Sequence, residues 1–377
     1  MTDILPYSER LSLKDFHFSY PEELVAQTPP EHRSASRLLY QRHPRQPLSD
    51  HYVTDLPELL PSGALLVLNN SGVFPGRLSG RLPGGGKAEI LLLRKPSGTG
   101  AQIQAPALGR PLRKLRPGTC ITFADSCQGT ILQQQCSSGQ GSVVIGFDLS
   151  EHEFDLWLHR AGEIPLPPYI RREQPQRADE SPDRERYQTV YAGPEGSAAA
   201  PTAGLHLDQE LLTKLAAKDI RTAEVTLHVG GGTFLPVRQQ DLAQHRMHTE
   251  CYQVPQQSVA AMLQAQEEGR PVIAVGTTSF RAVESLFPEA RKRGLSVSEL
   301  AGTWQETSLF VRPEFRESRY HSEIFTGIMT NFHQPETTLF MLICALLGFE
   351  RAQQAYRHAI GEGYRLFSYG DSGLFLF

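Results

Sequence analysis

Apolar and polar positions near the N-terminus form short blocks of the length of strands. Residues 37–42 (RLLYQR) and 64–70 (ALLVLNN) predict two strands. The second is almost wholly apolar, which is typical of a strand buried on both faces. Before them, residues 22–25 predict a single helical turn, because Pro29 and Pro30 cannot continue a helix.

The pattern changes after residue 71. The segments AEILLLR, TCITFAD, GTILQQQ and SVVIGFDL are short β-like runs, and turns rich in Gly, Pro and Ser separate them. This spacing predicts a small barrel or a sandwich. The block ends near residue 150, and from residue 151 the pattern becomes helical.

In the second half of the chain, helical and strand patterns alternate. Helices are predicted over residues 208–218, 256–268 and 279–286, and strands over residues 223–229 and 271–275. This order favours an α/β layer with some parallel strands.

We therefore expect an α/β fold whose mixed sheet is interrupted by an inserted β domain. Residues 1–71 would form the first part of the α/β domain, residues 72–150 the insertion, and residues 151–377 the second part.

Small residues dominate the stretch 187–207 (YQTVYAGPEGSAAAPTAGLHL). Its alanines and glycines, among them Gly204, would let backbone amides approach a ligand closely. Pro201 and Thr202 predict a turn and a cap at the entrance of the helix over residues 208–218. The alternative is a tight buried loop packed on a sheet, and this stretch alone does not separate the two.

Three further candidate sites lie where predicted strands end, the place where α/β sheets bind ligands. The VGTTS turn could hold a carboxylate or phosphate on amides and hydroxyls at a helix N-terminus. Its spacing matches neither a P-loop nor a dinucleotide fingerprint. The residues of these sites are His228 with Gly230 and Gly232, Thr277 and Thr278 before the helix that carries Arg281 and Glu284, and Asn331 with His333.

The histidines His206, His228, His248 and His333 are candidates for acid-base chemistry, although each alone is also compatible with a hydrogen-bonded structural role. His248 and Glu250 would share one face if they alternate on a strand. They could then be a base and its orienting partner, or two metal ligands. We expect no metal, because no third ligand has a convincing spacing and the cysteines form no CxxC pair.

Composition changes the picture in one respect. The 377 residues carry a net charge of -4, so a polyanionic partner would have to meet local patches. The densest cationic cluster contains Arg110, Arg113, Lys114 and Arg116, which predicts contact with phosphates unless it is a solvated loop. We expect a cytoplasmic protein without a membrane span, because no apolar run approaches the roughly 20 residues that a spanning helix needs.

The segments together resemble the S-adenosylmethionine:tRNA ribosyltransferase-isomerases of queuosine biosynthesis. The resemblance extends in family order from residue 21 to residue 371. It rests on PEELVAQTP, RSASRLL, LLVLNN, KAEILLLR, LPPYI, YQTVYA, GSAAAPTAGLH, VTLHVGGGTFLPV, HRMHTECY, VIAVGTTSFRAVES, TNFHQPETTLFML and YRLFSYGD.

This resemblance implies that S-adenosylmethionine donates its ribosyl moiety to 7-aminomethyl-7-deazaguanine at the wobble position of tRNA. Isomerisation would give epoxyqueuosine, with adenine and methionine released. The resemblance also implies an α/β domain interrupted by a β-barrel and no metal or redox cofactor. The implied partners are that tRNA and S-adenosylmethionine, and we expect a monomer.

Chemistry of this kind needs a base for the acidified proton beside the sulfonium and a proton donor for the departing adenine. His206, His228, His248, Glu250 and His333 are the catalytic candidates, which we expect to converge on one cleft, and their individual roles stay open. The expected substrate-binding residues are Pro201, Thr202, Gly204, Gly230, Gly232, Thr277, Thr278, Arg281, Glu284, Asn331 and Asp371. Arg113, Lys114 and Arg116 are expected to bind tRNA.

The chain departs from the family pattern at NNSGVFPGRL, where Gly72 replaces an Arg and Gly76 replaces an Ala. The alternative to an active transferase is therefore a divergent paralogue that binds tRNA or S-adenosylmethionine with altered or lost activity. A methyltransferase is disfavoured, because the N-terminal third lacks a Gly-rich turn between a strand and a helix.

Overall fold

The computed structural model describes residues 10–377 except 101, 138, 139, 173–180, 232–236, 238–240 and 246, and only the backbone of residues 136, 137 and 140. The chain forms two compact units. The first comprises Met1–Asn70, Pro201–Leu227 and Pro236–Phe377, and the second comprises Ser71–Ala200 and His228–Leu235.

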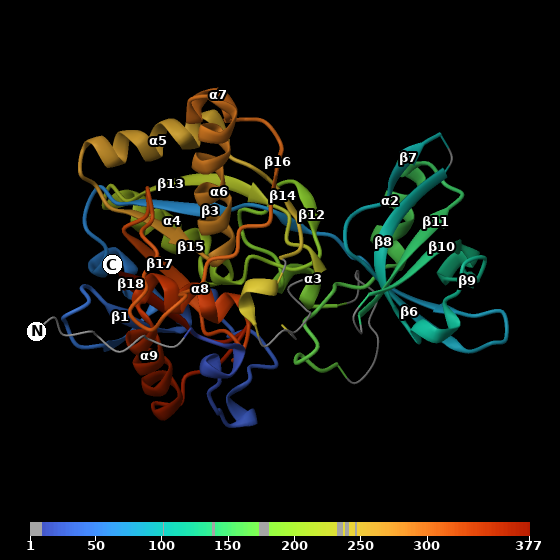
Figure 1. Cartoon of the computed structure of the whole chain (residues 1–377), viewed down its shortest axis with the longest axis horizontal. Coiled ribbons are helices and arrows are strands. Elements are labelled where there is room, and N and C mark those ends of the chain that lie inside the picture. Colours follow the sequence, from blue (N-terminus) through green and yellow to red (C-terminus); the bar gives the residue numbers. More distant parts are fainter. Residues whose placement is uncertain are drawn as a thin grey trace, which may run out of the picture. The chain divides into compact units, whose positions relative to one another are not determined.

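A mixed sheet of nine strands in the order β16-β14-β13-β3-β15-β17-β18-β1-β2 is the centre of the first unit (Figure 1). The four central strands β13, β3, β15 and β17 are parallel to one another, so their carboxyl ends meet at one edge. We call this the carboxyl edge. The bounds are β1 Arg37–Gln41, β2 Ser49–Tyr52, β3 Leu65–Asn69, β13 Arg221–Leu227, β14 Glu250–Gln253, β15 Val272–Val275, β16 Gln305–Thr307, β17 Gly327–Asn331 and β18 Ser372–Leu376.

Helices cover the central strands. All five residues of β3 are buried, as the apolar run predicts, and helices α5 and α6 pack against β13, β3 and β15 (Figure 1). The apolar helix α8 is buried over most of its length and packs against α9. Among the described residues, no helix is long and apolar enough to cross a membrane. The bounds are α1 Leu56–Leu59, α4 Gln209–Ala217, α5 Gln256–Glu267, α6 Thr277–Arg293, α7 Val297–Leu300, α8 Thr338–Leu347 and α9 Phe349–Gly361.

Two local expectations differ from the structure. Helix α6 is longer than the predicted 279–286 and continues through Pro288, because its buried face packs on the sheet and outweighs the lost hydrogen bond. Pro201 and Thr202 do not enter α4. They begin a separate 3₁₀ turn, Thr202–His206, and the side chain of Asp208 caps α4 by accepting a hydrogen bond from the amide of Leu211.

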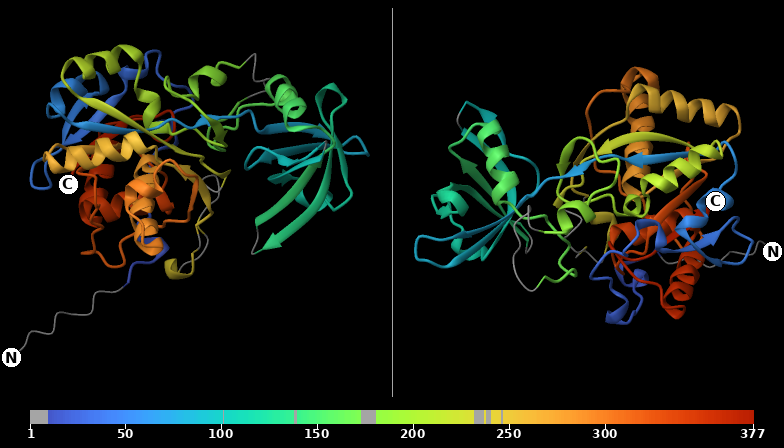
Figure 2. Two further views of the ribbon diagram at one scale, coloured as in Figure 1. Left: turned by 90° about the horizontal axis from the view of Figure 1, so that it is seen from above. Right: turned by 180° about the vertical axis from the view of Figure 1, so that it is seen from behind.

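The second unit contains a closed antiparallel barrel of β5, β6, β8, β11, β10 and β9 (Figure 2). The pairing of β11 with β8 closes the ring, which decides between the barrel and the sandwich. Strand β7 forms a short hairpin with β8. The bounds are β5 Arg77–Arg81, β6 Lys87–Leu92, β7 Ser97–Thr99, β8 Gln102–Arg110, β9 Cys120–Thr122, β10 Gln128–Ser137 and β11 Gln140–Phe147.

This unit is larger than the predicted insertion of residues 72–150. Helix α2, Glu151–Ala161, contributes Phe154, Trp157 and Leu158 to the core of the barrel, so it cannot be separated from the strands. The unit also contains the short helix α3, Asp183–Arg186, and a parallel pair formed by β4, Gly72–Val73, and β12, Glu195–Ser197.

Candidate functional site

Polar side chains at the carboxyl edge are fixed by the ends of neighbouring strands. Asn69 closes β3, and its amide group exchanges two hydrogen bonds of 3.0 Å with the backbone of Leu227 at the end of β13. β15 is followed by Gly276, whose φ of 91° suits a residue without a side chain, and by the first turn of α6. Asn331 is the last residue of β17.

Asn331 orients His206. The Nδ2 atom of Asn331 donates to the carbonyl oxygens of Phe367 and Ser368 at 3.0 and 3.2 Å. Its Oδ1 atom therefore faces Nε2 of His206, which lies 3.1 Å away. Because a carbonyl oxygen only accepts, this Nε2 carries the proton, and Nδ1 of His206 is left with the lone pair.

His206 is held in its neutral form. The side chain is 3% exposed, and burial lowers the pKa of His206 to about 4, although the hydrogen bond with Asn331 acts in the opposite direction. The positive charges of Arg365 and Arg33 lower it further. At neutral pH this imidazole is thus a hydrogen-bonding group and a proton acceptor, and it carries no charge.

His333 follows two residues after Asn331. Its Nε2 atom lies 2.9 Å from Oγ1 of Thr330, and its backbone amide donates to the hydroxyl oxygen of Tyr356 at 3.0 Å. Burial lowers the pKa of His333 to about 3. Both histidines of the carboxyl edge are therefore neutral. The sequence does not reveal this, because the pKa shift comes from burial in the fold.

The backbone beside Asn331 is strained. Phe367 has a φ of 72°, an unfavourable value for an aromatic residue, and its amide donates to the carbonyl of Phe332. Its own carbonyl accepts from Asn331. Strain of this kind costs on the order of 1–3 kcal/mol and often marks a functional site.

A second polar group lies at the first turns of α6. Arg281 forms a buried ion pair with Glu250, the first residue of β14, and its Nε donates to the carbonyl of Leu309 at 3.2 Å. Among the described residues, Nη2 of Arg281 has no hydrogen-bond partner, although it is buried. Oγ1 of Thr278 is likewise buried without a partner. Thr278 and Arg281 are three residues apart, so they lie on the same face of the helix.

His248 does not share a face with Glu250. The strand begins only at Glu250, which is buried, whereas His248 lies before it and is exposed. The expectation of two alternating residues on one strand is therefore wrong, because β14 does not include His248.

Two acidic candidates are occupied by contacts within the protein. Glu284 accepts hydrogen bonds from Tyr320 and Ser322, and burial raises the pKa of Glu284 despite them. Asp371 accepts from the backbone amides of Arg37 and Arg365 at 2.9 and 2.8 Å, which fixes the starts of β1 and β18. These contacts account for both carboxylates without a ligand.

The remaining substrate-binding candidates are spread over both units. Pro201, Thr202 and Gly204 belong to the 3₁₀ turn that leads to His206, and Thr277 is the first residue of α6. Gly230 lies in the second unit, and Gly232 lies outside the described residues.

In the second unit, a chain of hydroxyl groups holds His228. Nδ1 of His228 lies 2.7 Å from Oγ of Ser71, which lies 2.6 Å from Oγ of Ser197. Ser197 also accepts from the amide of Val229 at 2.9 Å. The imidazole ring lies on the backbone of Gly196, where an added Cβ would come within 2.5 Å of the ring. Sequence reasoning missed Ser71 and Ser197. Gly196, in the segment EGS, was the one residue that could have indicated a close approach of another group to this backbone.

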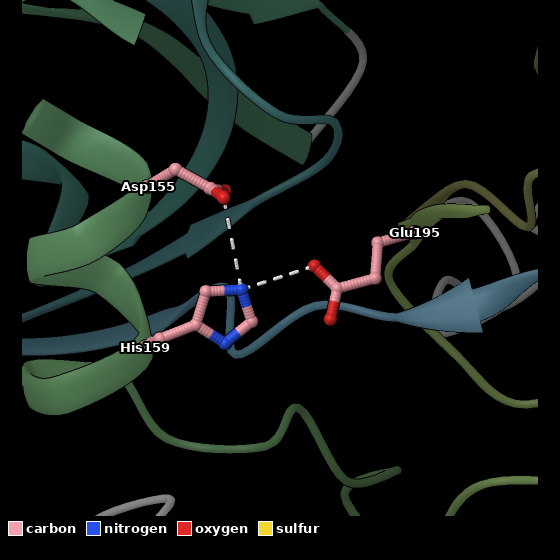
Figure 3. Close-up of side chains that lie close together, drawn as sticks. All are labelled: Asp155, His159 and Glu195. Carbon is pink, nitrogen blue, oxygen red and sulfur yellow. Dashed lines mark hydrogen bonds and ion pairs between the residues drawn. The ribbon is translucent and has the colours of Figure 1, made fainter. Parts of the chain in front are cut away.

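Asp155, His159 and Glu195 form a cluster in the same unit (Figure 3), and Lys95 pairs with both of its carboxylates. Asp155, His159 and Glu195 form the one group among the described residues whose ligand atoms are close enough for a metal ion. The Nζ atom of Lys95, however, lies 2.6 Å from Asp155 and 2.9 Å from Glu195. This ammonium already supplies the positive charge, so the donor set does not fit a cation.

Lys95 affects the electrostatics of the second unit. Burial alone would lower its pKa, but hydrogen bonds with Asp155 and Glu195 outweigh burial and raise the pKa of Lys95. Burial and then the charge of Lys95 lower the pKa of His228. His228 therefore shares a preference for the neutral form with His206 and His333. The convergence of all the candidate histidines on one cleft stays a prediction, because His228 belongs to the other unit.

The predicted basic cluster lies on the barrel. Arg113 and Lys114 belong to a 3₁₀ turn, Leu112–Lys114, and with Arg116 they are exposed. Among the described residues, no ion pair neutralises these three cations. Their contact with tRNA stays a prediction.

The unusual glycines of NNSGVFPGRL have steric partners. A Cβ at Gly76 would lie 2.4 Å from the ring of Phe74, so the small residue makes room for the aromatic one. A Cβ at Gly72 would lie 3.2 Å from both the side chain of Glu195 and the carbonyl of Gly193. The departures from the family pattern are thus matched by their surroundings.

Comparison with known proteins extends the picture to the whole chain. A family model described as a queuosine biosynthesis protein matches residues 13–375. The S-adenosylmethionine:tRNA ribosyltransferase-isomerase of Anaeromyxobacter sp. (strain Fw109-5) is 45% identical over 365 residues, which cover 97% of this chain and 99% of that protein. The protein of the same name from Dinoroseobacter shibae is 42% identical over 374 residues, with 97% and 99% covered.

A solved structure agrees with the fold. The crystal structure of S-adenosylmethionine tRNA ribosyltransferase from Thermotoga maritima matches with a TM-score of 0.50 and 28% identity, and the match covers 96% of this chain and all of that one. The fold and these relatives define a class, the enzymes of tRNA modification that act as transferase and isomerase. The chain belongs to the S-adenosylmethionine:tRNA ribosyltransferase-isomerase family of queuosine biosynthesis.

Proposed function

We propose that this enzyme transfers the ribosyl moiety of S-adenosylmethionine to 7-aminomethyl-7-deazaguanine at the wobble position of tRNA and isomerises it, giving epoxyqueuosine with release of adenine and methionine. The observation that carries the proposal is that neutral histidines and open hydrogen-bond donors at the start of α6 belong to the same edge of the sheet. The names of the relatives support the same substrates.

The open donors suit the carboxylate of the methionyl group. Leaving a buried polar group without a partner costs about 1–3 kcal/mol, so Nη2 of Arg281 and Oγ1 of Thr278 gain most from a ligand that accepts hydrogen bonds. The N-terminus of α6 adds a favourable dipole for an anion. Glu250 keeps the remaining side of the Arg281 guanidinium in place.

The neutral histidines suit the proton transfers. In this proposal, the Nδ1 lone pair of His206 accepts the proton beside the sulfonium, and Asn331 stabilises the resulting imidazolium through Nε2. A partner of this kind acts as the orienting group of a catalytic base. The imidazolium of His206 can return this proton to the departing adenine, so the proton is accounted for, and His333, which is also neutral, is a further candidate for the base. These steps are acid-base chemistry on the protein's own side chains, and we propose that they need no metal or redox cofactor.

The overall reaction can be tested directly. Incubation of the protein with S-adenosylmethionine and tRNA that carries 7-aminomethyl-7-deazaguanine, followed by mass analysis of nucleosides, should give epoxyqueuosine, adenine and methionine. A methylated nucleoside with S-adenosylhomocysteine would overturn the proposal. We also propose that the enzyme is cytoplasmic and that it is a monomer.

Single substitutions test the assigned residues. Thr278→Val removes one open donor without changing the side-chain shape, so we expect the KM for S-adenosylmethionine to rise roughly tenfold. Thr213→Val in α4, whose hydroxyl donates to a carbonyl of its own helix, is the matched control. His206→Ala should lower turnover about 10²-fold or more, whereas His248→Ala at an exposed position should leave it near normal. If His206→Ala keeps the near-normal turnover that we expect of His248→Ala, His206 has no part in the mechanism.

A further inference from the structure

A pocket of about 570 Å³ lies in the first unit, away from the carboxyl edge. His43, Pro44 and Arg45, from the turn between β1 and β2, line it together with Arg319. β1 is parallel to β18, and β18 is antiparallel to β17. The direction of β1 is therefore antiparallel to that of the four central strands. The turn after β1 therefore lies at the sheet edge opposite to the candidate site.

Positive charge accumulates at this pocket. The guanidinium of Arg319 packs on Gly348, where an added Cβ would lie 2.9 Å from Nε and from Nη2. Arg351 lies three residues after Gly348, in the first turn of α9, and burial and then the charge of Arg319 lower the pKa of Arg351 to about 10. Arg351 donates to Gln41 and to the carbonyl of Leu376, and its buried Nη1 has no hydrogen-bond partner.

Counter-charges are missing from the same place. Within the part of the chain that the structure describes, no ion pair joins the side chain of Arg45 or Arg319 to an acidic group. The neighbouring acids have other partners: Glu350 pairs with Arg316 at 2.9 Å, and Asp50 accepts from Tyr364 and His358. Like charges gathered without an anion repel one another, so an anionic ligand would stabilise this arrangement.

We propose that the pocket lined by His43, Arg45 and Arg319 binds a backbone phosphate of the tRNA. Guanidinium groups match phosphate oxygens with paired donors. Nδ1 of His43 accepts the amide of Arg45 at 3.2 Å, so Nε2 carries the ring proton and is a further donor. The lining consists of three cationic or polar side chains and Pro44, and its one aromatic ring, that of His43, already accepts the amide of Arg45 on Nδ1. A sugar-phosphate backbone therefore fits better than a free nucleotide.

This inference rests on the proposed tRNA substrate. Equilibrium binding measurements test the phosphate site separately from the proposed function. The double variant Arg45→Ala/Arg319→Ala should bind tRNA more weakly than the wild type, and the slope of log K against log salt concentration should become shallower by about 0.7–1.8, for one or two lost contacts. The KM for tRNA should rise while kcat at saturating tRNA stays unchanged, because the pocket lies at the opposite edge. Unchanged affinity and slope in a variant that keeps the wild-type Tm would overturn the pocket site but leave the proposed function standing.

Two controls sharpen the test. Lys214→Ala/Lys218→Ala in and next to α4 removes the same charge from side chains that already pair with Glu210 and Glu58, and should leave the slope unchanged. Inorganic phosphate is the second probe. If it raises the Tm of the wild type but not of the double variant while tRNA affinity is equal in both, the pocket belongs to a small anion and the proposal fails. A wild type that binds no tRNA would instead refute the proposed function.

Discussion

His206 links the local environment of one residue to the stability of the protein. Its pKa is about 4 when folded and near 6.5 in an unfolded chain, so the unfolded state binds the proton first as the pH falls. His206 thus contributes stability that is complete above pH 6.5 and is lost as the pH falls towards 4. At pH 5 the loss amounts to roughly 2 kcal/mol.

The variant His206→Gln should therefore show a smaller fall in unfolding free energy between pH 7 and pH 5 than the wild type. Urea titrations at the two pH values measure the difference. Other groups titrate in both proteins, so their effects cancel in the comparison. Parallel losses in the two proteins would mean that His206 is not held neutral by burial.

Gly76 and Phe74 form a pair that should be tested together. Gly76→Ala places a methyl group against the ring of Phe74 and should destabilise the protein by about 1–3 kcal/mol. Phe74→Ile in the same chain removes the obstacle and should recover part of this loss, as measured by thermal unfolding. If the double variant is no more stable than the sum of the single changes predicts, the two positions are independent.

At the scale of single residues, the sequence identifies candidate side chains, but it does not predict their contacts or their protonation states. Asn331 and His206 are both among its candidates, but they are 125 positions apart, and only the fold brings them together. The proton position on His206 follows from the carbonyls of Phe367 and Ser368, which no local pattern reveals. Ser71 and Ser197 escaped notice for the same reason, because serine is common and its partner His228 is distant in the chain.

Elements with a clear apolar period are predicted well. β3, α4 and the barrel strands β6, β9, β10 and β11 lie where the pattern places them, because burial on one or both faces dictates the residues, whereas β5 and β8 of the barrel were not predicted. The end of α6 is missed, since tertiary packing carries this helix past Pro288. The turn at Thr202 is also missed, because a 3₁₀ turn and a cap begin with the same residue types.

The basic turn of the barrel gives a prediction at the level of an element. Replacing Arg113 and Lys114 by Ala should weaken tRNA binding and reduce the slope of its salt dependence by roughly 1 for each lost phosphate contact. Filter binding at several salt concentrations measures both quantities. Both side chains are exposed, so folding should be unaffected. A solvated turn without a role would leave the affinity and slope as they are.

At the scale of the whole molecule, the change of pattern at residue 71 locates the beginning of the second unit closely. The predicted end of the insertion at residue 150 is too early, because the helix that follows this residue completes the barrel core. A helical pattern does not show which sheet the helix covers.

Two fragments test this boundary. A fragment of residues 71–200 should unfold cooperatively, whereas a fragment of residues 71–150 should not. Losing Phe154, Trp157 and Leu158 removes roughly 5 kcal/mol or more of apolar burial. Circular dichroism during heating distinguishes a sigmoidal from a gradual transition. A cooperative transition in the shorter fragment would show that the strands alone suffice.

The parallel pairing of β4 with β12 has a consequence for the history of the chain. Gly72 lies opposite Glu195, so the main segment of the second unit, Ser71–Ala200, has its two ends side by side. A module whose two ends are neighbours can be spliced into a host loop without stretching it, because the gap that the host must bridge is short. Exchange of the whole barrel between members of the family, with the paired strands β4 and β12 as the joint, is therefore the substitution that this architecture tolerates best.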